Sequence, residues 1–144
     1  RHAGSYSHLA DFTQGGFKEV IDDAATTVPA GVKKVLFCSG KIYFELLDKK
    51  IANHREDVAI VRLEQIHPLP HVQLAELNKK YHKATWFWVQ EEPMNMGAAT
   101  FLKMNLQGIN FGVISRKASA STATGYAKVH AKEQAEIIDT AFSI

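Results

Sequence analysis

Residues 33–51 read "KKVLFCSGKIYFELLDKKI", and two hydrophobic patterns meet within this stretch. Its first part is a short continuous apolar run, which is typical of a strand buried on both faces of a parallel sheet. Its second part places Tyr43, Leu46 and Leu47 on one side of a helix, and Ile51 continues that side. A buried strand followed directly by an amphipathic helix predicts an α/β fold.

The same alternation continues toward the carboxyl terminus. Three further apolar runs are "DVAIVRL" at 57–63, "TWFWVQ" at 85–90 and "FGVIS" at 111–115, and we expect the second of these to end where Glu91 and Glu92 begin. Helical patterns contain Leu74, Leu77 and Tyr81, and later extend from Tyr126 to Ala141. Parallel neighbouring strands need a crossover, usually a helix, so the pattern predicts a three-layer α/β/α domain with a mainly parallel sheet.

The amino-terminal part is less regular. Residues 1–31 are rich in Gly, Ser, Thr and His, and contain one short apolar segment around Phe17, Val20 and Ile21. We interpret them as a lead-in segment that packs on a neighbouring domain, followed by an α/β domain over residues 32–144. The first residue is Arg1 rather than Met and no leader pattern follows it, so we expect a piece of a longer protein.

Composition excludes several classes of protein. A chain of 144 residues with 46% hydrophobic residues can build one domain core. Its 17 basic and 15 acidic residues leave a net charge of +2, too small for a protein held mainly by nucleic-acid phosphates. The single cysteine, Cys38, excludes a disulfide framework, and no apolar run approaches the roughly 18 residues of a membrane span. We expect a soluble intracellular protein with neither nucleic acid nor membrane as a partner.

Polar residues cluster where each predicted strand ends, and ligands of open parallel sheets bind beyond the carboxyl ends of the strands. Ser39 and Lys41 stand at a helix start, where the helix dipole favours an anion. Arg62 and Arg116 can add bidentate contacts, and Gln90 can add an amide. The pattern predicts an anion-binding crevice, although a plain helix-capping turn with a solvated lysine explains the first cluster equally well.

Catalytic and metal-binding patterns are not recognised. The chain has neither a P-loop nor a Gly-x-Ser-x-Gly elbow. No pair of histidines has the i,i+4 ligand spacing on a helix, because His67 precedes a proline, which favours extended backbone. Adjacent Glu91 and Glu92 point to opposite faces of an extended chain, so they cannot readily share a proton. We expect Cys38 to be a buried structural thiol and Trp86 and Trp88 to be core or interface residues. The Ser- and Thr-rich residues 118–125 are typical of a loop that caps the following helix.

Four long segments resemble one known family in order and spacing. They are "VLFCSGKIYFEL", "VAIVRLEQIHPLP", "FWVQEEPMNMGA" and "ASASTATGYAKVHAKEQ", and they resemble the carboxyl-terminal domain of the thiamine-diphosphate-dependent component of 2-oxoglutarate dehydrogenase. The likeness covers residues 32–142, and the lead-in segment resembles the family more loosely. It implies a Rossmann-like unit similar to the carboxyl-terminal domain of transketolase, within a parent enzyme that uses thiamine diphosphate and Mg²⁺. The family's Gly-Asp-Gly cofactor motif is absent here, so the resemblance implies a fragment that binds no cofactor and is inactive alone.

The resemblance also implies partners: the remaining domains of the parent chain, a second copy in a homodimer, and a dihydrolipoyl succinyltransferase. It implies an acetyl-CoA or AMP effector near this domain, and we expect the contacts at the predicted crevice, namely at Ser39, Lys41, Arg62, Gln90 and Arg116. It implies the cytoplasm of a bacterium, or the mitochondrial matrix of a eukaryote, and we favour the cytoplasm. Two alternatives stay open, namely a freestanding CoA- or nucleotide-binding regulatory module, and the terminal domain of another thiamine-dependent 2-oxoacid dehydrogenase or transketolase.

One segment departs from the family pattern. Where the family usually has prolines in Arg-Pro-Ala-Ser-Ala-Ser-Pro, this chain has Lys117 and Thr122. Because proline fixes one backbone angle, we expect this loop to be less rigid than in the family.

Overall fold

Four parallel strands form the centre of the protein in a computed structural model that describes residue 2 and residues 4–143. The four apolar runs predicted from the sequence are all strands. They are β2 (Lys34–Cys38), β3 (Val58–Leu63), β4 (Thr85–Pro93) and β5 (Phe111–Arg116). The sheet has the order β1-β3-β2-β4-β5. The additional edge strand, β1 (Val20–Ile21), pairs antiparallel with β3. The prediction of a mainly parallel sheet is confirmed.

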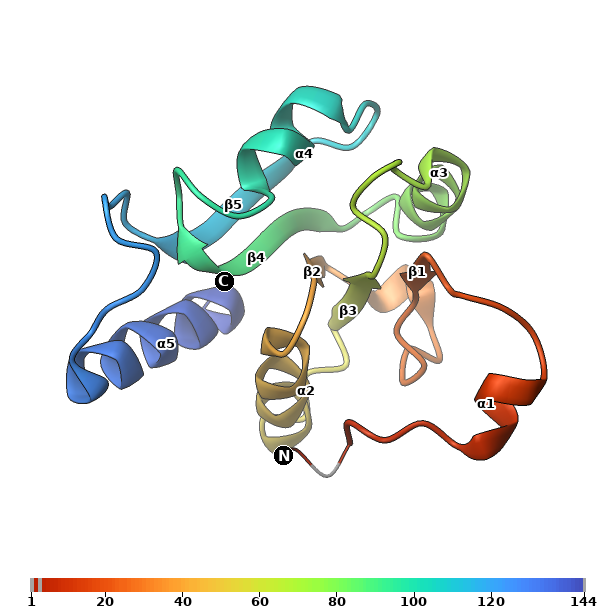
Figure 1. The fold of residues 1–144 in the computed structure, drawn as a ribbon. Helices are drawn as coiled ribbons and strands as arrows, with labels where there is room; N and C mark the ends of the chain where they lie inside the picture. Colours follow the sequence, from red (N-terminus) through yellow and green to blue (C-terminus); the bar gives the residue numbers. More distant parts are fainter. Residues whose placement is uncertain (1, 3, 144) are drawn as a thin grey trace.

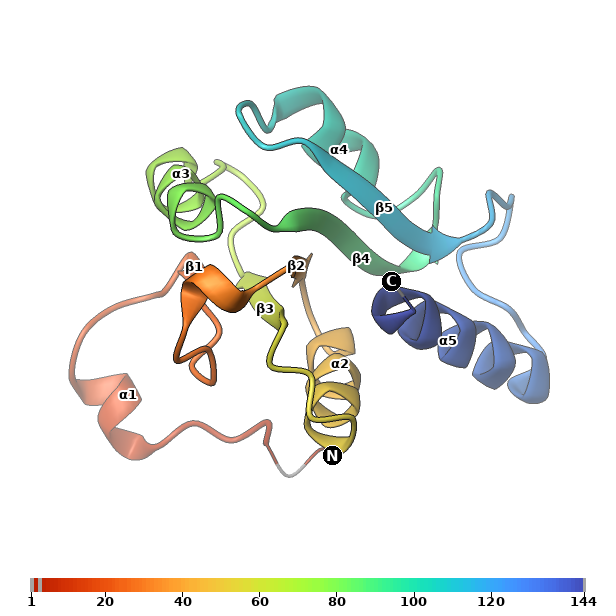
Figure 2. The ribbon, with the colours of Figure 1, turned by 180° about the vertical axis from the view of Figure 1, so that it is seen from behind.

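Helices cover both faces of this sheet (Figures 1 and 2). On one face lie α2 (Ile42–Ala52) and α5 (Ala127–Phe142), and on the other lie α3 (His71–Lys80) and α4 (Ala99–Asn105). The two hydrophobic clusters reflect this division, because one contains side chains of α2 and α5 and the other contains side chains of α3 and α4. The predicted three-layer α/β/α architecture is therefore confirmed.

The central strand β2 divides its side chains between the two clusters. Phe37 packs with Trp86 and Trp88 toward α3 and α4, with ring centroids 5.6 and 5.1 Å apart. Leu36 and Cys38, which point the other way, pack toward α2 and α5. This alternation follows from the two-residue period of a strand, and the two tryptophans are core residues.

Strand β4 does not end where the sequence pattern predicted. It continues through Glu91 and Glu92 to Pro93, and its register with β5 shifts between Val89 and Pro93. The expected end at Gln90 was therefore wrong. At this rim Lys41 pairs with Glu91, and Met94 N–H donates to the Arg116 carbonyl, so polar side chains do not stop the strand.

The lead-in segment contributes more structure than its composition suggests. It contains α1 (Leu9–Thr13), the edge strand β1 and a 3₁₀ turn, η1 (Pro29–Gly31). In Figures 1 and 2 its first part swings away from the sheet and returns at β1. The proposed boundary between residues 31 and 32 stays a prediction, and residues 1, 3 and 144 of the two proposed segments lie outside the described residues.

Candidate functional site

The carboxyl edge of the sheet carries all five residues that the sequence marked for an anion. Cys38 is in register with Arg62 of β3 and with Val89 of β4, so Ser39 and Gln90 follow at the same edge. Arg116 ends β5 and lies in register with Pro93, beyond the irregularity of β4. Their common edge follows directly from parallel pairing, while their environments differ.

Lys41 lies in the turn between β2 and α2. Gly40 adopts a positive φ of 77°, which a glycine reaches without strain, and the turn leads into the first residues of α2. The Lys41 ammonium pairs with Glu91 of β4 and lies 4.0 Å from Glu45 of α2. Its side chain is 69% exposed, so this cation remains accessible to a ligand that competes with two carboxylates.

Arg62 occupies a defined position on β3. Its Nε donates a hydrogen bond to Glu64 at 2.8 Å, and its guanidinium lies 4.7 Å from the centre of the Tyr43 ring. The cation–π contact and the ion pair together fix the Arg62 side chain. Burial is the main cause that raises the pKa of the neighbouring Tyr43 hydroxyl. Arg62 is thus a half-buried cation held beside α2.

Gln90 is the most buried of the five residues, with 3% of its surface exposed. Its Oε1 accepts hydrogen bonds from Trp88 Nε1 at 2.7 Å and from the Ala99 N–H at 3.0 Å. Its Nε2 donates to the carbonyls of Pro93 and Met96, at 3.0 and 2.7 Å. The amide therefore ties β4 to the turn before α4 and to the first residue of that helix.

Arg116 lies on the face of β5 that meets α5, with 8% of its side chain exposed. Its Nε is 3.2 Å from Glu133, and its Nη2 donates to Gln134 at 3.3 Å and lies 3.3 Å from a ring nitrogen of His130. Gln134 in turn donates to Glu45 of α2 at 3.1 Å. A chain of polar contacts thus extends along the carboxyl edge between α5 and α2.

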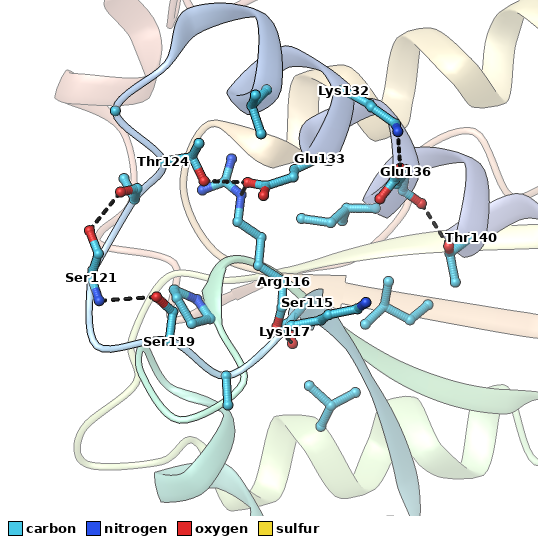
Figure 3. A pocket seen from close by; sticks show the side chains of 18 residues that line it. Ser115, Arg116, Lys117, Ser119, Ser121, Thr124, Lys132, Glu133, Glu136 and Thr140 are labelled. Atoms are coloured by element: carbon cyan, nitrogen blue, oxygen red, sulfur yellow. Dashed lines mark hydrogen bonds and ion pairs between the residues drawn. The ribbon is translucent and has the colours of Figure 1, made fainter.

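A cleft of about 700 Å³ opens beside Arg116 (Figure 3). One wall is the segment 117–125, which we call the strap, and another is α5. Of the five predicted residues, only Arg116 lines this cleft. The structure therefore brings the five residues to one edge but does not gather them in one cavity.

The strap does not cap α5 as its composition suggested. The residue that precedes the helix is Tyr126, which makes no side-chain capping hydrogen bond. Instead the Thr124 hydroxyl donates to the Glu133 carboxylate at 2.5 Å, in the second turn of the helix. Sequence reasoning missed Thr124 and Glu133 as cleft residues, although the Ser- and Thr-rich composition of the strap was the signal that marked the place.

Neither a metal site nor a reactive thiol is found among the described residues. Among residue 2 and residues 4–143, no three His, Cys, Asp or Glu side chains lie close enough to hold a metal ion. Burial raises the pKa of the Cys38 thiol to about 12, which opposes a nucleophilic thiolate. Within the same described part of the chain, no helix has the length and hydrophobicity needed to cross a membrane.

The protein is a three-layer α/β domain, and its candidate site residues lie at the carboxyl end of a mainly parallel sheet. A family model described as "2-oxoglutarate dehydrogenase C-terminal" matches residues 6–142. The chain therefore belongs to the family of 2-oxoglutarate dehydrogenase carboxyl-terminal domains.

Curated relatives agree with this membership. The chain is 38% identical to a protein of Haemophilus influenzae and 37% identical to one of Azotobacter vinelandii, both named 2-oxoglutarate dehydrogenase E1 component. It is 42% identical to the "Multifunctional 2-oxoglutarate metabolism enzyme" of Mycolicibacterium vanbaalenii. These matches cover 99%, 100% and 99% of this chain, but only 16%, 16% and 12% of the three relatives. The chain thus spans less than a fifth of the length of each of these relatives.

Proposed function

We propose that this chain is the terminal domain of a longer 2-oxoglutarate dehydrogenase. That parent enzyme decarboxylates 2-oxoglutarate and transfers the succinyl group to a lipoyl group of a dihydrolipoyl succinyltransferase. The observation that carries the proposal is the family match over residues 6–142 together with relatives several times longer than the chain. The bacterial sources of the relatives favour the cytoplasm as its location.

Thiamine diphosphate and Mg²⁺ would supply the electron sink for this decarboxylation, held by other domains of the parent. The described residues of this chain do not fit the cofactor, because they offer no cluster of Mg²⁺ ligands and the chain has no Gly-Asp-Gly motif. Accordingly the terminal domain contributes no catalytic residue in this proposal.

The domain's own role is to hold the parent enzyme together, both between domains and between the two copies of a homodimer. This is supported by the lead-in segment, where Leu9, Phe12 and Phe17 are 80%, 76% and 69% exposed. None of the residues of α1, all of which lie within the described part of the chain, is buried. Apolar side chains gathered on one short segment are typical of a surface that another domain covers.

The parent activity is tested with the full-length polypeptide that carries this domain. We expect 2-oxoglutarate to support ferricyanide reduction when thiamine diphosphate and Mg²⁺ are present, and pyruvate to support little. Turnover with pyruvate and none with 2-oxoglutarate would favour another 2-oxoacid dehydrogenase. A native polypeptide of only 16.0 kDa on an immunoblot would instead favour the freestanding regulatory module.

The assembly role is tested separately by changing Leu9 and Phe12 to Asp in the same polypeptide. Charged side chains cannot be buried there without a large desolvation cost, so we expect the dimer to dissociate at higher protein concentration in sedimentation experiments. Val72 on α3 is 70% exposed and offers the matched control, Val72→Asp. Equal sedimentation of all variants and the unchanged enzyme would contradict this role.

An effector site is a second proposed function, favoured by the common edge that holds Ser39, Lys41, Arg62, Gln90 and Arg116. Accessible Lys41 and half-buried Arg62 suit the phosphates of acetyl-CoA or AMP. We expect Lys41→Ala and Arg62→Ala to weaken activation by these effectors about tenfold each. Lys49→Ala, on the far end of α2, is the control and should leave activation unchanged.

A further inference from the structure

The cleft beside Arg116 has features that the proposed functions leave unexplained. Its volume of about 700 Å³ falls in the range of sites for small organic molecules. Figure 3 shows the Arg116 side chain between the strap and α5, with its guanidinium beside Thr124 and Glu133. The cleft lies beside the edge strand β5, away from the lead-in segment.

Arg116 is a buried cation whose ion pair with Glu133 is poorly aligned for a hydrogen bond. Its side chain is 8% exposed, and its Nε makes no hydrogen bond to any described residue, although Glu133 lies 3.2 Å away. A buried N–H group without a well-aligned acceptor is costly, and an additional acceptor would remove that cost. Because Nε itself is buried, a carboxylate that enters from the cleft has to take the place of Glu133 at the guanidinium.

The strap that encloses the cleft is fixed at two points. At one end the Asn95 amide exchanges two hydrogen bonds of 3.0 Å with the backbone of Ser119. At the other end Thr124 donates to Glu133. Residues 117–125 contain no proline, so these side-chain bonds rather than fixed backbone angles hold the strap in place.

The lining limits the charge of a ligand. Three basic side chains, Arg116, Lys117 and Lys132, face two acidic ones, Glu133 and Glu136, which leaves one net positive charge. The two carboxylates would repel a ligand with several negative charges. A ligand with one negative charge is balanced by the one net positive charge of the lining. The remaining walls include Val113, Ile137 and other apolar side chains. An apolar part of a ligand can pack against them and bury their surface.

We propose that this cleft binds a small organic monocarboxylate with a short apolar tail. The carboxylate accepts hydrogen bonds from Arg116 and attracts Lys117, while the tail covers the apolar wall formed by β5 and α5. Glu133 competes with the ligand for the same guanidinium, so it weakens the binding of the monocarboxylate. This site shares Arg116 with the edge proposed for acetyl-CoA or AMP, but Ser39, Lys41, Arg62 and Gln90 do not line the cleft, and the proposal does not depend on them.

Calorimetric titration of the native polypeptide that contains this chain tests the proposal, with hexanoate as the probe. Hexanamide has the same tail without the charge, and we expect it to bind at least about tenfold more weakly. AMP carries more than one negative charge and should not displace hexanoate. Equal binding of hexanoate and hexanamide, or displacement by AMP, would overturn the assignment of a monoanion site.

Three variants identify the groups responsible. Lys117→Gln should weaken hexanoate binding several-fold, whereas the matched control Lys128→Gln, exposed on α5 outside the cleft, should not change it. Glu133→Gln removes the competing carboxylate, and we expect it to tighten hexanoate binding about tenfold, a gain that a purely structural role would not produce. Unchanged affinity in both Lys117→Gln and Glu133→Gln overturns the proposal even if effector activation behaves as proposed above.

Discussion

The Asp23 carboxylate and the Lys50 ammonium lie 2.5 Å apart, with only 5% and 8% of the two side chains exposed. Asp23 also accepts a hydrogen bond of 2.8 Å from the Ile60 N–H, on the edge of β3. The neighbouring Asp22 accepts from the Tyr81 hydroxyl at 2.7 Å. Consecutive aspartates therefore fasten the lead-in segment to α2, to β3 and to the end of α3.

Removing one partner of this buried pair should be costly. Asp23→Ala leaves the Lys50 ammonium buried without its carboxylate and leaves the Ile60 N–H without an acceptor. We expect the free energy of unfolding to fall by about 3 kcal/mol, as urea denaturation would measure. The double change Asp23→Ala with Lys50→Met should recover much of this loss, since it removes the isolated charge.

An exposed pair gives the control for that prediction. Lys49 and Asp139 form an ion pair of 2.8 Å, but 36% and 64% of their side chains are exposed. Asp139→Ala should change the unfolding free energy by less than about 0.5 kcal/mol, because solvent screens the pair. Similar losses for Asp23→Ala and Asp139→Ala would contradict a stabilising role of burial at Asp23.

The central part of the fold could be predicted because its signals are local. Strands buried on both faces, such as the one that contains Val35–Cys38, have a continuous apolar sequence. A few consecutive residues are therefore enough to predict such a strand. Strand β1 was missed as a strand because it has two residues and depends on pairing Val20 with Leu63. Helix α4 was missed because its first N–H is satisfied from a distance, by Gln90 rather than by a neighbouring capping residue.

The candidate site was predictable in its location but not in its pairing. Parallel strands must bring their carboxyl ends together, so the common edge of Ser39, Arg62 and Arg116 follows from the sequence pattern. By contrast, Lys41 meets Glu91 across 50 positions of sequence, and no local pattern reports such a contact. Whether the edge binds an effector stays a prediction.

Gln90 should contribute to stability through the turn that it supports. Gln90→Ala removes the acceptor for Trp88 Nε1 and for the Ala99 N–H, and leaves both donors buried without a partner. We expect a loss of about 3 kcal/mol in the free energy of unfolding, measured by urea denaturation. Gln107→Ala, at an exposed position after α4, is the control and should cost less than about 0.5 kcal/mol.

Gly97 offers a second approach to the same contact. Its φ is 65°, and a Cβ added there would lie 2.9 Å from Gln90 Oε1. We expect Gly97→Ala to destabilise the protein by about 2 kcal/mol, because both the backbone strain and the crowding of the amide oppose it. Gly16→Ala, where an added Cβ meets nothing within 4 Å, is the control. Equal stability of the two variants would contradict a tight turn around Gln90.

Cys38 should resist alkylation while the protein is folded. Burial raises its pKa to about 12, so at pH 8 the thiol stays protonated. We expect mass spectrometry to find almost no iodoacetamide adduct in the native protein, and complete modification in urea. Rapid modification of the folded protein would show that the strand end at Cys38 opens to solvent.

The Arg55–Asp57 pair should make stability depend on acid pH. Arg55 donates two hydrogen bonds to Asp57, of 2.7 and 3.0 Å, and these bonds lower the pKa of Asp57 below its usual 3.8, with Lys33 adding to the effect. Because the folded pKa is the lower one, the unfolded chain binds the proton first as pH falls. The stabilisation is thus complete well above pH 3.8 and is lost as pH falls through the folded pKa.

Asp57→Asn tests this dependence directly. We expect the variant to be less stable than the unchanged protein at pH 7, and the difference to shrink as the pH falls below 3.8, in urea denaturation at a series of pH values. Asp139→Asn, whose carboxylate is 64% exposed, should show no such convergence. A difference for Asp57→Asn that stays constant from pH 7 to pH 2 would mean that its charge adds nothing, and that only packing or hydrogen bonds of the neutral side chain matter at this position.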